Sequence, residues 1–125
     1  EEYTDEPGNK GLLRYNDERL EYLMRVAMNS NFQVNTHAIG DSANLKVLDN
    51  YERLIGETGS RYMRHRIEHA QILRYEDIER FNNLGVIPSM QSIHATSDKN
   101  MAQDRLGEER IQRAFGLQIH ETKLT

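Results

Sequence analysis

Two histidines stand where the sequence predicts the carboxyl ends of successive β-strands. His37 ends the alternating segment 32–37, and His69 lies at the end of segment 63–70. They are 32 residues apart (69 − 37), close to the ~30-residue length of one strand–helix–strand unit. Imidazole nitrogens are common zinc ligands, so the pair has the chemistry to share one metal ion. Two hydrogen-bonded strand-end histidines are the alternative, because a catalytic zinc takes about three protein ligands and the spacing locates only two.

A polar loop after the third predicted strand holds further side chains with binding chemistry. Gln91, His94 and Asp98 all lie in it. Loops at the carboxyl ends of parallel strands collect substrate contacts, so these three residues are the predicted substrate-binding groups. A merely solvated polar loop is the competing interpretation. Ser97 lies in the same loop without evident histidine and acid partners, so a serine nucleophile has little support.

Two acidic residues lie close to the histidines, and both have structural explanations. Asp41 is expected to cap the helix after the first strand, because aspartate is a preferred N-cap. Glu68 precedes His69, so strand alternation puts it on the opposite face. There it is expected to pair with Arg64 or Arg66 at the helix layer, although a charged outer face is unusual for a parallel sheet. No catalytic acid or base is assigned from the sequence.

The elements that position these residues follow from hydrophobic periodicity. Asn16 is a predicted N-cap with Asp17 and Glu18 in the first turn, where the helix dipole favours acids. Apolar residues recur at helical spacing in some segments and alternate in others, which separates helices from strands. The predicted helices cover 17–29, 41–55, 75–84 and 108–115, and the predicted strands cover 32–37, 63–70 and 86–91.

Alternating helices and strands predict an α/β fold with about three parallel strands and flanking helices. Residues 1–125 are expected to form a single unit, because 125 residues suit one domain. A closed (β/α)8 barrel takes about 250 residues, so the chain is expected to supply only part of one. An open doubly wound sheet has the same local pattern, and periodicity does not separate the two.

Composition narrows the function classes. The net charge is -4, with 16 basic and 20 acidic residues and no basic stripe, which argues against nucleic-acid binding. The absence of cysteine excludes disulfides and thiolate metal sites. Apolar runs stay far below the ~20 residues of a membrane span, and the start at Glu1 without a signal-peptide pattern suits a processed or excised segment. A soluble protein is expected, with the cytoplasm favoured.

Three blocks of the sequence resemble successive blocks of amidohydrolase family 3, which includes N-substituted formamide deformylase-like and exoenzyme regulatory protein-like members. Segment 5–11 is also similar to the loop before the family's fourth helix, and segment 104–107 to the region after its seventh strand. The resemblance covers about residues 1–115. The three blocks are His37-Ala38-Ile39-Gly40-Asp41, His65-Arg66-Ile67-Glu68-His69-Ala70-Gln71 and Met90-Gln91-Ser92-Ile93-His94-Ala95-Thr96-Ser97-Asp98.

The resemblance implies a partial TIM (β/α)8 barrel that contains strands five to seven. His37 and His69 would then be metal ligands, with zinc the favoured divalent ion. The remaining family ligands, a His-x-His pair, a carboxylated lysine or acid and an aspartate, match no position here, and residues 116–125 depart from the pattern. The implied reaction is hydrolysis of a C–N bond in a small-molecule amide or cyclic amide, with the metal polarising the carbonyl and activating water.

Three expectations concern the isolated chain. Two ligands hold a metal weakly, so the chain alone is expected to be inactive even where the parent protein is an enzyme. A slice of a barrel also leaves open sheet edges, which recruit further strands, so a homo-oligomer is expected. The rival hypotheses are a non-catalytic regulatory or interaction module of α/β fold and an open-sheet binding domain without metal.

Overall fold

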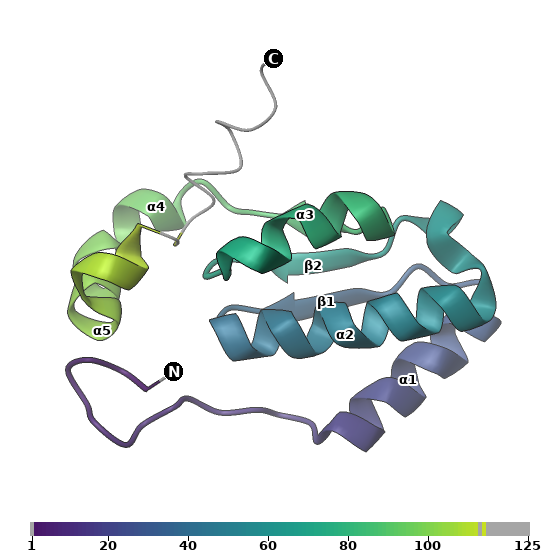
Figure 1. Cartoon of the computed structure of the whole chain (residues 1–125), viewed down its shortest axis with the longest axis horizontal. Helices are drawn as coiled ribbons and strands as arrows, with labels where there is room; N and C mark the ends of the chain where they lie inside the picture. Colours follow the sequence, from purple (N-terminus) through teal and green to yellow (C-terminus); the bar gives the residue numbers. More distant parts are fainter. Residues whose placement is uncertain (1, 113, 115–125) are drawn as a thin grey trace, which may run out of the picture.

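A computed structural model describes residues 2–112 and 114, and it shows a parallel three-stranded sheet in the order β1-β2-β3. Helices α1, α2 and α3 lie on one side of this sheet (Figure 1). The predicted α/β fold with about three parallel strands and flanking helices is therefore confirmed. The elements are α1 (Asp17–Asn29), β1 (Asn35–Ala38), α2 (Asp41–Thr58), η1 (Ser60–Met63), β2 (Arg66–His69), α3 (Tyr75–Leu84), β3 (Ile87–Ser89), α4 (His94–Ser97) and α5 (Lys99–Ile111).

Helix α1 begins and ends where the sequence predicts. The side chain of Asn16 accepts a hydrogen bond from the backbone N–H of Arg19 at 2.9 Å. Two residues past the helix, Asn31 has a φ of 60°, a left-handed conformation that asparagine tolerates better than most residues. The capping side chains are thus visible in the sequence itself.

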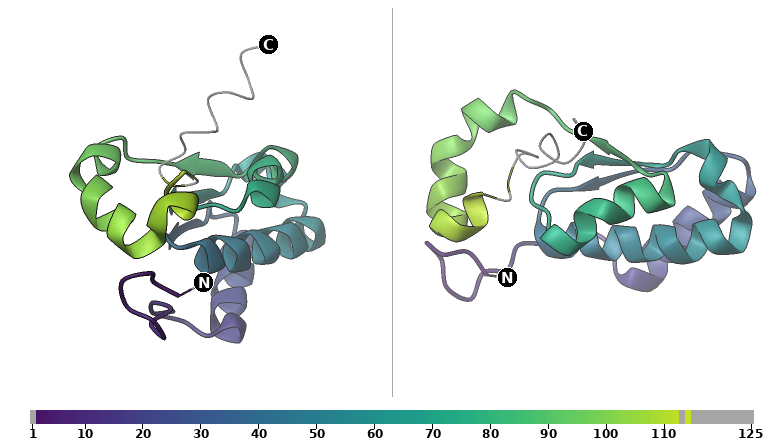
Figure 2. Two further views of the ribbon diagram at one scale, coloured as in Figure 1. Left: turned by 60° about the vertical axis from the view of Figure 1, so that its left-hand side comes forward. Right: turned by 45° about the horizontal axis from the view of Figure 1, so that its top comes forward.

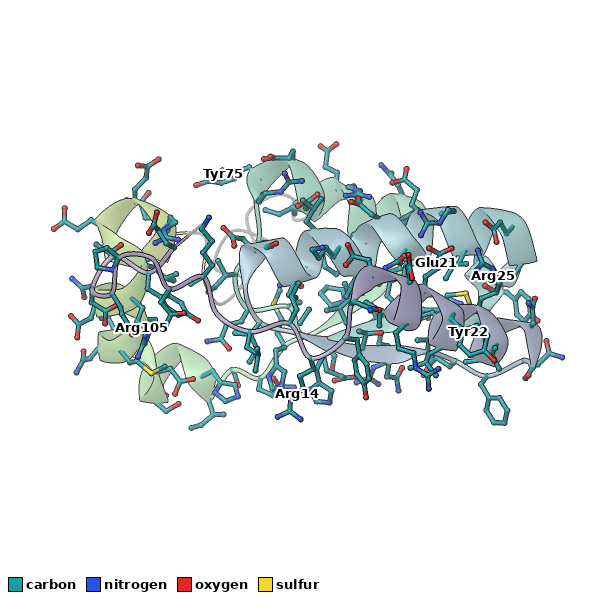
Figure 3. All side chains as sticks on the ribbon, turned by 90° about the horizontal axis from the view of Figure 1, so that it is seen from below. Arg14, Glu21, Tyr22, Arg25, Tyr75 and Arg105 are labelled. Carbon is teal, nitrogen blue, oxygen red and sulfur yellow. The ribbon has the colours of Figure 1, made fainter. Side chains whose placement is uncertain are left out.

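Ion pairs join the outer faces of α1 and α2. Arg25 contacts Glu21 at 2.7 Å and Glu57 at 3.1 Å, and Glu21 also contacts Arg53 at 2.6 Å. Figure 3 shows Glu21 and Arg25 on the face of α1 that meets α2. Exposed pairs of this kind contribute about 0–1 kcal/mol each, so they align the helices more than they stabilise the fold.

The first two strands are shorter than predicted, because side chains take the place of ladder partners. Segment 32–34 is not a strand. There the N–H of Val34 donates to His65 Nδ1 at 3.0 Å, and Gln33 Nε2 donates to the carbonyls of Met63 and Arg64 at 3.0 and 2.7 Å. Segment 63–65 is not a strand either, since Arg64 has a φ of 53° directly after η1.

Strand β3 and helix α2 also differ from prediction at their ends. Strand β3 is reduced to three residues around Pro88, which is tolerated because β3 is an edge of this sheet. Helix α2 runs through Gly56 to Thr58 and ends at Gly59, whose φ of 66° suits a residue without Cβ. The N-cap of α2 is Gly40, so the predicted capping role of Asp41 is wrong. Asp41 is the first helical residue, and its carboxylate accepts from Ser42 N at 2.8 Å.

The polar loop predicted after the third strand is largely helical in the structure. Helices α4 and α5 stand beyond the carboxyl ends of the strands, apart from the helix layer (Figure 2). Ala102 and Leu106 of α5 are buried and pack in a small cluster with Ala114. Because these buried residues are few and widely spaced, the sequence gives only a weak indication of a helix here. The predicted helix 108–115 therefore lies partly in α5 and partly on residues 113 and 115, outside the described residues.

The faces predicted for the second strand are wrong. Ile67 is fully buried in the core under the helices, and its register partner Thr36 contacts the hydroxyl of Tyr51 on α2 at 3.2 Å. Glu68 is the register partner of His37 on the opposite face. The Arg66–Glu68 pair therefore lies on the face away from the helix layer, which removes the anomaly of charged groups under the helices.

Two buried polar side chains complete the amino end of this sheet. The hydroxyl of Tyr51 lies within hydrogen-bond distance of the carbonyls of Arg66, at 2.7 Å, and Val34, at 3.0 Å, and its one proton is shared between them. Its ring stacks on His65 at 5.5 Å between centroids. The imidazole of His65 in turn lies 2.9 Å from Ser60 Oγ through Nε2. Burial is the main cause that raises the pKa of Tyr51, so its hydroxyl stays a donor at neutral pH.

No helix in the part of the chain that the structure describes is both long and apolar enough to span a membrane.

The buried imidazole of His65 predicts a pH-dependent stability. Nδ1 accepts from Val34 N–H, so protonation would replace an acceptor with a donor facing a donor. Burial lowers the pKa of His65 below its ordinary value of 6.5. The unfolded chain therefore binds this proton first, and the free energy of unfolding is expected to fall as pH drops from 6.5 toward the folded-state pKa. Urea unfolding across pH 5–8, compared with His65→Gln, measures the effect. Parallel curves for the two proteins would contradict it.

The hydroxyl of Tyr51 is expected to stabilise the fold measurably. Tyr51→Phe leaves the Arg66 and Val34 carbonyls without this donor, so a loss of about 1–3 kcal/mol is expected. Tyr62→Phe is the matched control, because Tyr62 is 74% exposed and donates to Asn31 at 3.3 Å. That change should stay within about 0.5 kcal/mol. Equal losses in chemical denaturation would show that the hydroxyl of Tyr51 has no special part in the sheet.

Candidate functional site

Three imidazole rings gather at the carboxyl ends of the strands. His37 lies on β1, His69 ends β2 and His94 begins α4. The ring centroids of His37 and His69 are 5.1 Å apart, and those of His69 and His94 are 5.7 Å apart. The strands and α4 meet at this end of the molecule in Figure 1. The two sequence-predicted metal ligands are thus neighbours, with a predicted substrate-binding residue beside them.

A left-handed backbone places the ring of His69 next to His37. Regular alternation would put His69 on the same face as Ile67, under the helices. Instead His69 has a φ of 73° and Ala70 a φ of 44°. Such conformations cost on the order of 1–3 kcal/mol at residues other than glycine and concentrate at functional sites. This strained backbone brings together two imidazoles that a regular strand would keep on opposite faces.

The ring of His69 also carries an unsatisfied nitrogen. Its Nδ1 is buried and has no hydrogen-bond partner among the described residues. Buried polar atoms are nearly always satisfied, so an orphaned imidazole nitrogen beside a second imidazole fits a place for a ligand. His37 is solvent-exposed on the uncovered face of β1, so this place is open to an incoming ion.

His94 is oriented by an acid one helical turn away. Its Nδ1 lies 2.8 Å from Asp98 Oδ2. A hydrogen bond from Ser97, followed by the contact with His94, lowers the pKa of Asp98, so the carboxylate is charged at neutral pH. An ionised acceptor at Nδ1 favours the tautomer with the proton there. The remaining nitrogen, Nε2, is then an acceptor.

Gln91 lies just past β3 and is held by its amide nitrogen. Nε2 donates to the carbonyl of Ser89 at 3.2 Å, whereas Oε1 is buried and has no partner among the described residues. The side chain therefore presents an unpaired acceptor at the same end of the sheet. The structure brings His94 and Asp98 together with the histidine pair, and it places Gln91 at the end of the neighbouring strand.

A charged cluster lies on the His37 face of the sheet, and it contains the predicted pair of Glu68 with Arg66 on the face opposite to the predicted one. Arg66 Nε lies 2.8 Å from Glu68 Oε1, and Arg66 Nη2 donates to Ser89 Oγ at 2.6 Å. A hydrogen bond from Ser89, then the contacts with Arg66 and the charge of His37, lower the pKa of Glu68 against the effect of burial. Alternation along the sheet, counted from Thr36, places Glu68 on the face away from the helices. The prediction counted from His69 instead, and the positive φ of His69 makes that count wrong.

The residues present fit a metal in part. Within residues 2–112 and 114, no group of three or more histidine, cysteine, aspartate or glutamate side chains is arranged to hold an ion. The pair His37 and His69 offers two imidazoles, one with an orphaned nitrogen. Imidazole suits zinc and other late divalent metals. The described chain therefore has donors for half of a tetrahedral ligand set.

Comparison with curated proteins identifies two relatives. Over 110 residues the chain is 42% identical to Protein LONG AFTER FAR-RED 3 of Arabidopsis thaliana, covering 88% of this chain and 19% of that protein. Over 116 residues it is 38% identical to Putative amidohydrolase YtcJ of Bacillus subtilis (strain 168), covering 92% of this chain and 21% of that protein. The chain thus spans about a fifth of the length of the curated relatives it matches.

Two solved structures share the fold. An uncharacterized metal-dependent hydrolase from Pyrococcus furiosus matches 97% of this chain and 24% of its own, with a TM-score of 0.82 and 33% sequence identity. A second, from Pyrococcus horikoshii OT3, matches 92% of this chain and 22% of its own, with a TM-score of 0.77 and 34% identity. These matches agree with the partial fold that the sequence resemblance implied.

The model of one protein family, described as amidohydrolase family, matches residues 1–119. That range contains the histidine pair, the α4 residues and every described helix and strand. Because this match covers nearly the whole chain, the chain belongs to the amidohydrolase family.

Proposed function

We propose that this chain is the part of a metal-dependent amidohydrolase barrel that contains strands five to seven. The parent enzyme would hydrolyse C–N bonds of small-molecule amides or cyclic amides. The observation that carries the proposal is the 5.1 Å separation of the His37 and His69 rings at the carboxyl ends of adjacent parallel strands. Active sites of (β/α)8 barrels are built at that end.

His37 and His69 are the proposed metal ligands, with zinc the favoured ion. When bound, a divalent metal of this kind polarises a carbonyl and activates water at neutral pH. The chain's own contribution is to hold both imidazoles at one place, His69 through its left-handed backbone and His37 through the end of β1. The remaining ligands and the general base would come from the other strands of the parent barrel.

His94, Asp98 and Gln91 are proposed to bind the substrate. Asp98 holds the proton of His94 on Nδ1, so Nε2 is free to accept a hydrogen bond. Gln91 Oε1 is a second acceptor without a partner among the described residues. These two acceptors, one on the ring 5.7 Å from that of His69 and one just past β3, match the N–H groups of an amide, whereas a hydrocarbon or an anionic ester would leave them unpaired. A site that hydrogen-bonds a substrate N–H discriminates strongly against analogues that lack it.

If His37 and His69 bind the metal and His94 binds the substrate, substitutions of the two kinds should have different effects in the full polypeptide that contains this sequence. His37→Ala or His69→Ala is expected to weaken zinc binding on the order of 100-fold, because about 10–16 kcal/mol of apparent zinc affinity is shared among about four ligands. His94→Ala should leave zinc affinity nearly unchanged and raise KM for an amide substrate. Competition with a chromogenic chelator measures the first quantity and steady-state kinetics the second. Similar zinc affinity in all three variants would contradict the ligand assignment.

The 125-residue chain on its own is expected to be inactive and self-associating. Two ligands hold a divalent ion weakly, and strands β1 and β3 have unpaired edges in the described sheet. Exposed Phe32 next to β1 adds an apolar surface. Amide and hydantoin turnover with zinc is to be compared with a chelated control, and sedimentation velocity at micromolar concentration reports assembly. Metal-dependent turnover that disappears in His37→Ala would contradict the first expectation, and a compact monomer the second.

A further inference from the structure

The buried side-chain amide of Asn44 connects the loop after β1 with the loop after β2. Asn44 lies in the first turn of α2 and is fully buried. Its Nδ2 lies within hydrogen-bond distance of four backbone carbonyls: Gly40 at 2.9 Å, Ile72 at 3.1 Å, Ile39 at 3.2 Å and Ala38 at 3.3 Å. Three of these carbonyls belong to the end of β1 and the loop after it, and one belongs to the loop after β2.

The two loops bear directly on the histidine pair. The β1 loop begins two residues after His37, and the contact at Ile72 lies three residues after His69. A backbone hydrogen bond from Ile72 N–H to Ile39 O, at 2.9 Å, crosses between the same two loops. Asn44 therefore lies where the exits of β1 and β2 meet, and its contacts link the segments that carry both imidazoles.

The chemistry of the site explains why an amide stands there. Asparagine is a poor helix residue, since its side chain competes for backbone hydrogen bonds. Its Oδ1 is buried without a partner among the described residues, so the side chain is used through its two N–H donors. A hydroxyl offers one donor with a shorter reach, and a carboxylate would repel the carbonyl oxygens. The surroundings therefore select a neutral group with two donors.

We propose that Asn44 is a positioning residue that sets the placement of His37 relative to His69 by tying the loop after β1 to the loop after β2. The proposal rests on the proposed function of the two histidines as metal ligands. Asn44 touches neither ring. It acts through the backbone, and in particular it braces the segment in which His69 and Ala70 hold left-handed conformations.

A second buried asparagine in the same helix provides a matched control. Asn50 is 5% exposed, and its Oδ1 accepts from Arg53 Nη2 at 2.7 Å, within α2. Asn50→Ala removes the same group from the same helix without touching the strand-end loops. Asn44→Ser separates two roles of Asn44, because a serine hydroxyl bonds the carbonyl four residues earlier, here Gly40, but does not span to Ile72.

The test uses the full polypeptide in which this sequence occurs, stripped of metal and titrated with Co²⁺. Asn44→Ala and Asn44→Ser are expected to weaken Co²⁺ binding by about 10–100-fold, the range for residues that orient metal ligands, and to change the visible Co²⁺ spectrum. Amide exchange at Ile72 should accelerate in the metal-free protein. Asn50→Ala should leave the Co²⁺ affinity, the spectrum and the Ile72 exchange as they are, even where it lowers the free energy of unfolding equally.

Two outcomes separate the inference from the function beneath it. Co²⁺ affinity and spectrum that respond alike to Asn44→Ser and Asn50→Ala, while His37→Ala weakens binding on the order of 100-fold, would overturn the positioning role and leave the metal site standing. Co²⁺ binding that survives His37→Ala unchanged would overturn the proposed function, and the inference with it. Loss of affinity in the Asn44 variants, with Asn50→Ala unaffected at matched stability, supports the inference.

Discussion

The structure depends on side chains that satisfy the backbone at both ends of a very short sheet. With four, four and three residues, the strands leave many N–H and C=O groups beyond the ladder, and unpaired buried groups of this kind are costly. At the amino end, His65 and Tyr51 supply an acceptor and a donor to the backbone of both neighbouring strands. At the carboxyl end, Asn44 supplies donors to the loops. Helix α2 carries two of these three groups, so it supports the whole arrangement.

The two ends of the sheet use this constraint in opposite ways. The amino end is satisfied and neutral: His65 is buried, its ring bonds on both nitrogens, and its pKa is lowered by burial. The carboxyl end retains strain and unpaired atoms, namely the left-handed His69 and Ala70 and the orphaned nitrogen of His69. The amino end of the sheet is therefore stable, and the carboxyl end is strained and unsatisfied. This difference is expected of a barrel, whose chemistry lies at the carboxyl ends of its strands.

The charged groups on the His37 face are also paired and hydrogen-bonded with one another. Arg66, Glu68 and Ser89 bond one another across β2 and β3. Buried or half-buried charges persist when they are paired and hydrogen-bonded. The cluster therefore gives the open face of the sheet a fixed polar layer beneath the histidines, while the opposite face is apolar and covered by α2 and α3. The match to about a quarter of a larger hydrolase chain fits a face that is completed by further strands.

Local physical chemistry made much of this protein predictable from its sequence. The helix cap at Asn16, the helical stripe of α2, the order of elements and the strand-end positions of His37 and His69 all follow from periodicity and capping, which act over a few residues. The resemblance of the three motif blocks to one family was equally local and was confirmed. Sequence also singled out His94 and Asp98 as polar residues of the loop after the third strand, but the helical turn that brings them into contact was not predicted. Tertiary structure alone decided the strand lengths, the face of Glu68, and the role of Asn44, since each depends on a partner about 20 or more residues away. The decisive case is His69. Its left-handed φ places its ring on the face where His37 lies, in a segment whose backbone bonds to the loop after β1 through Ile72, and alternation along a strand does not predict that reversal.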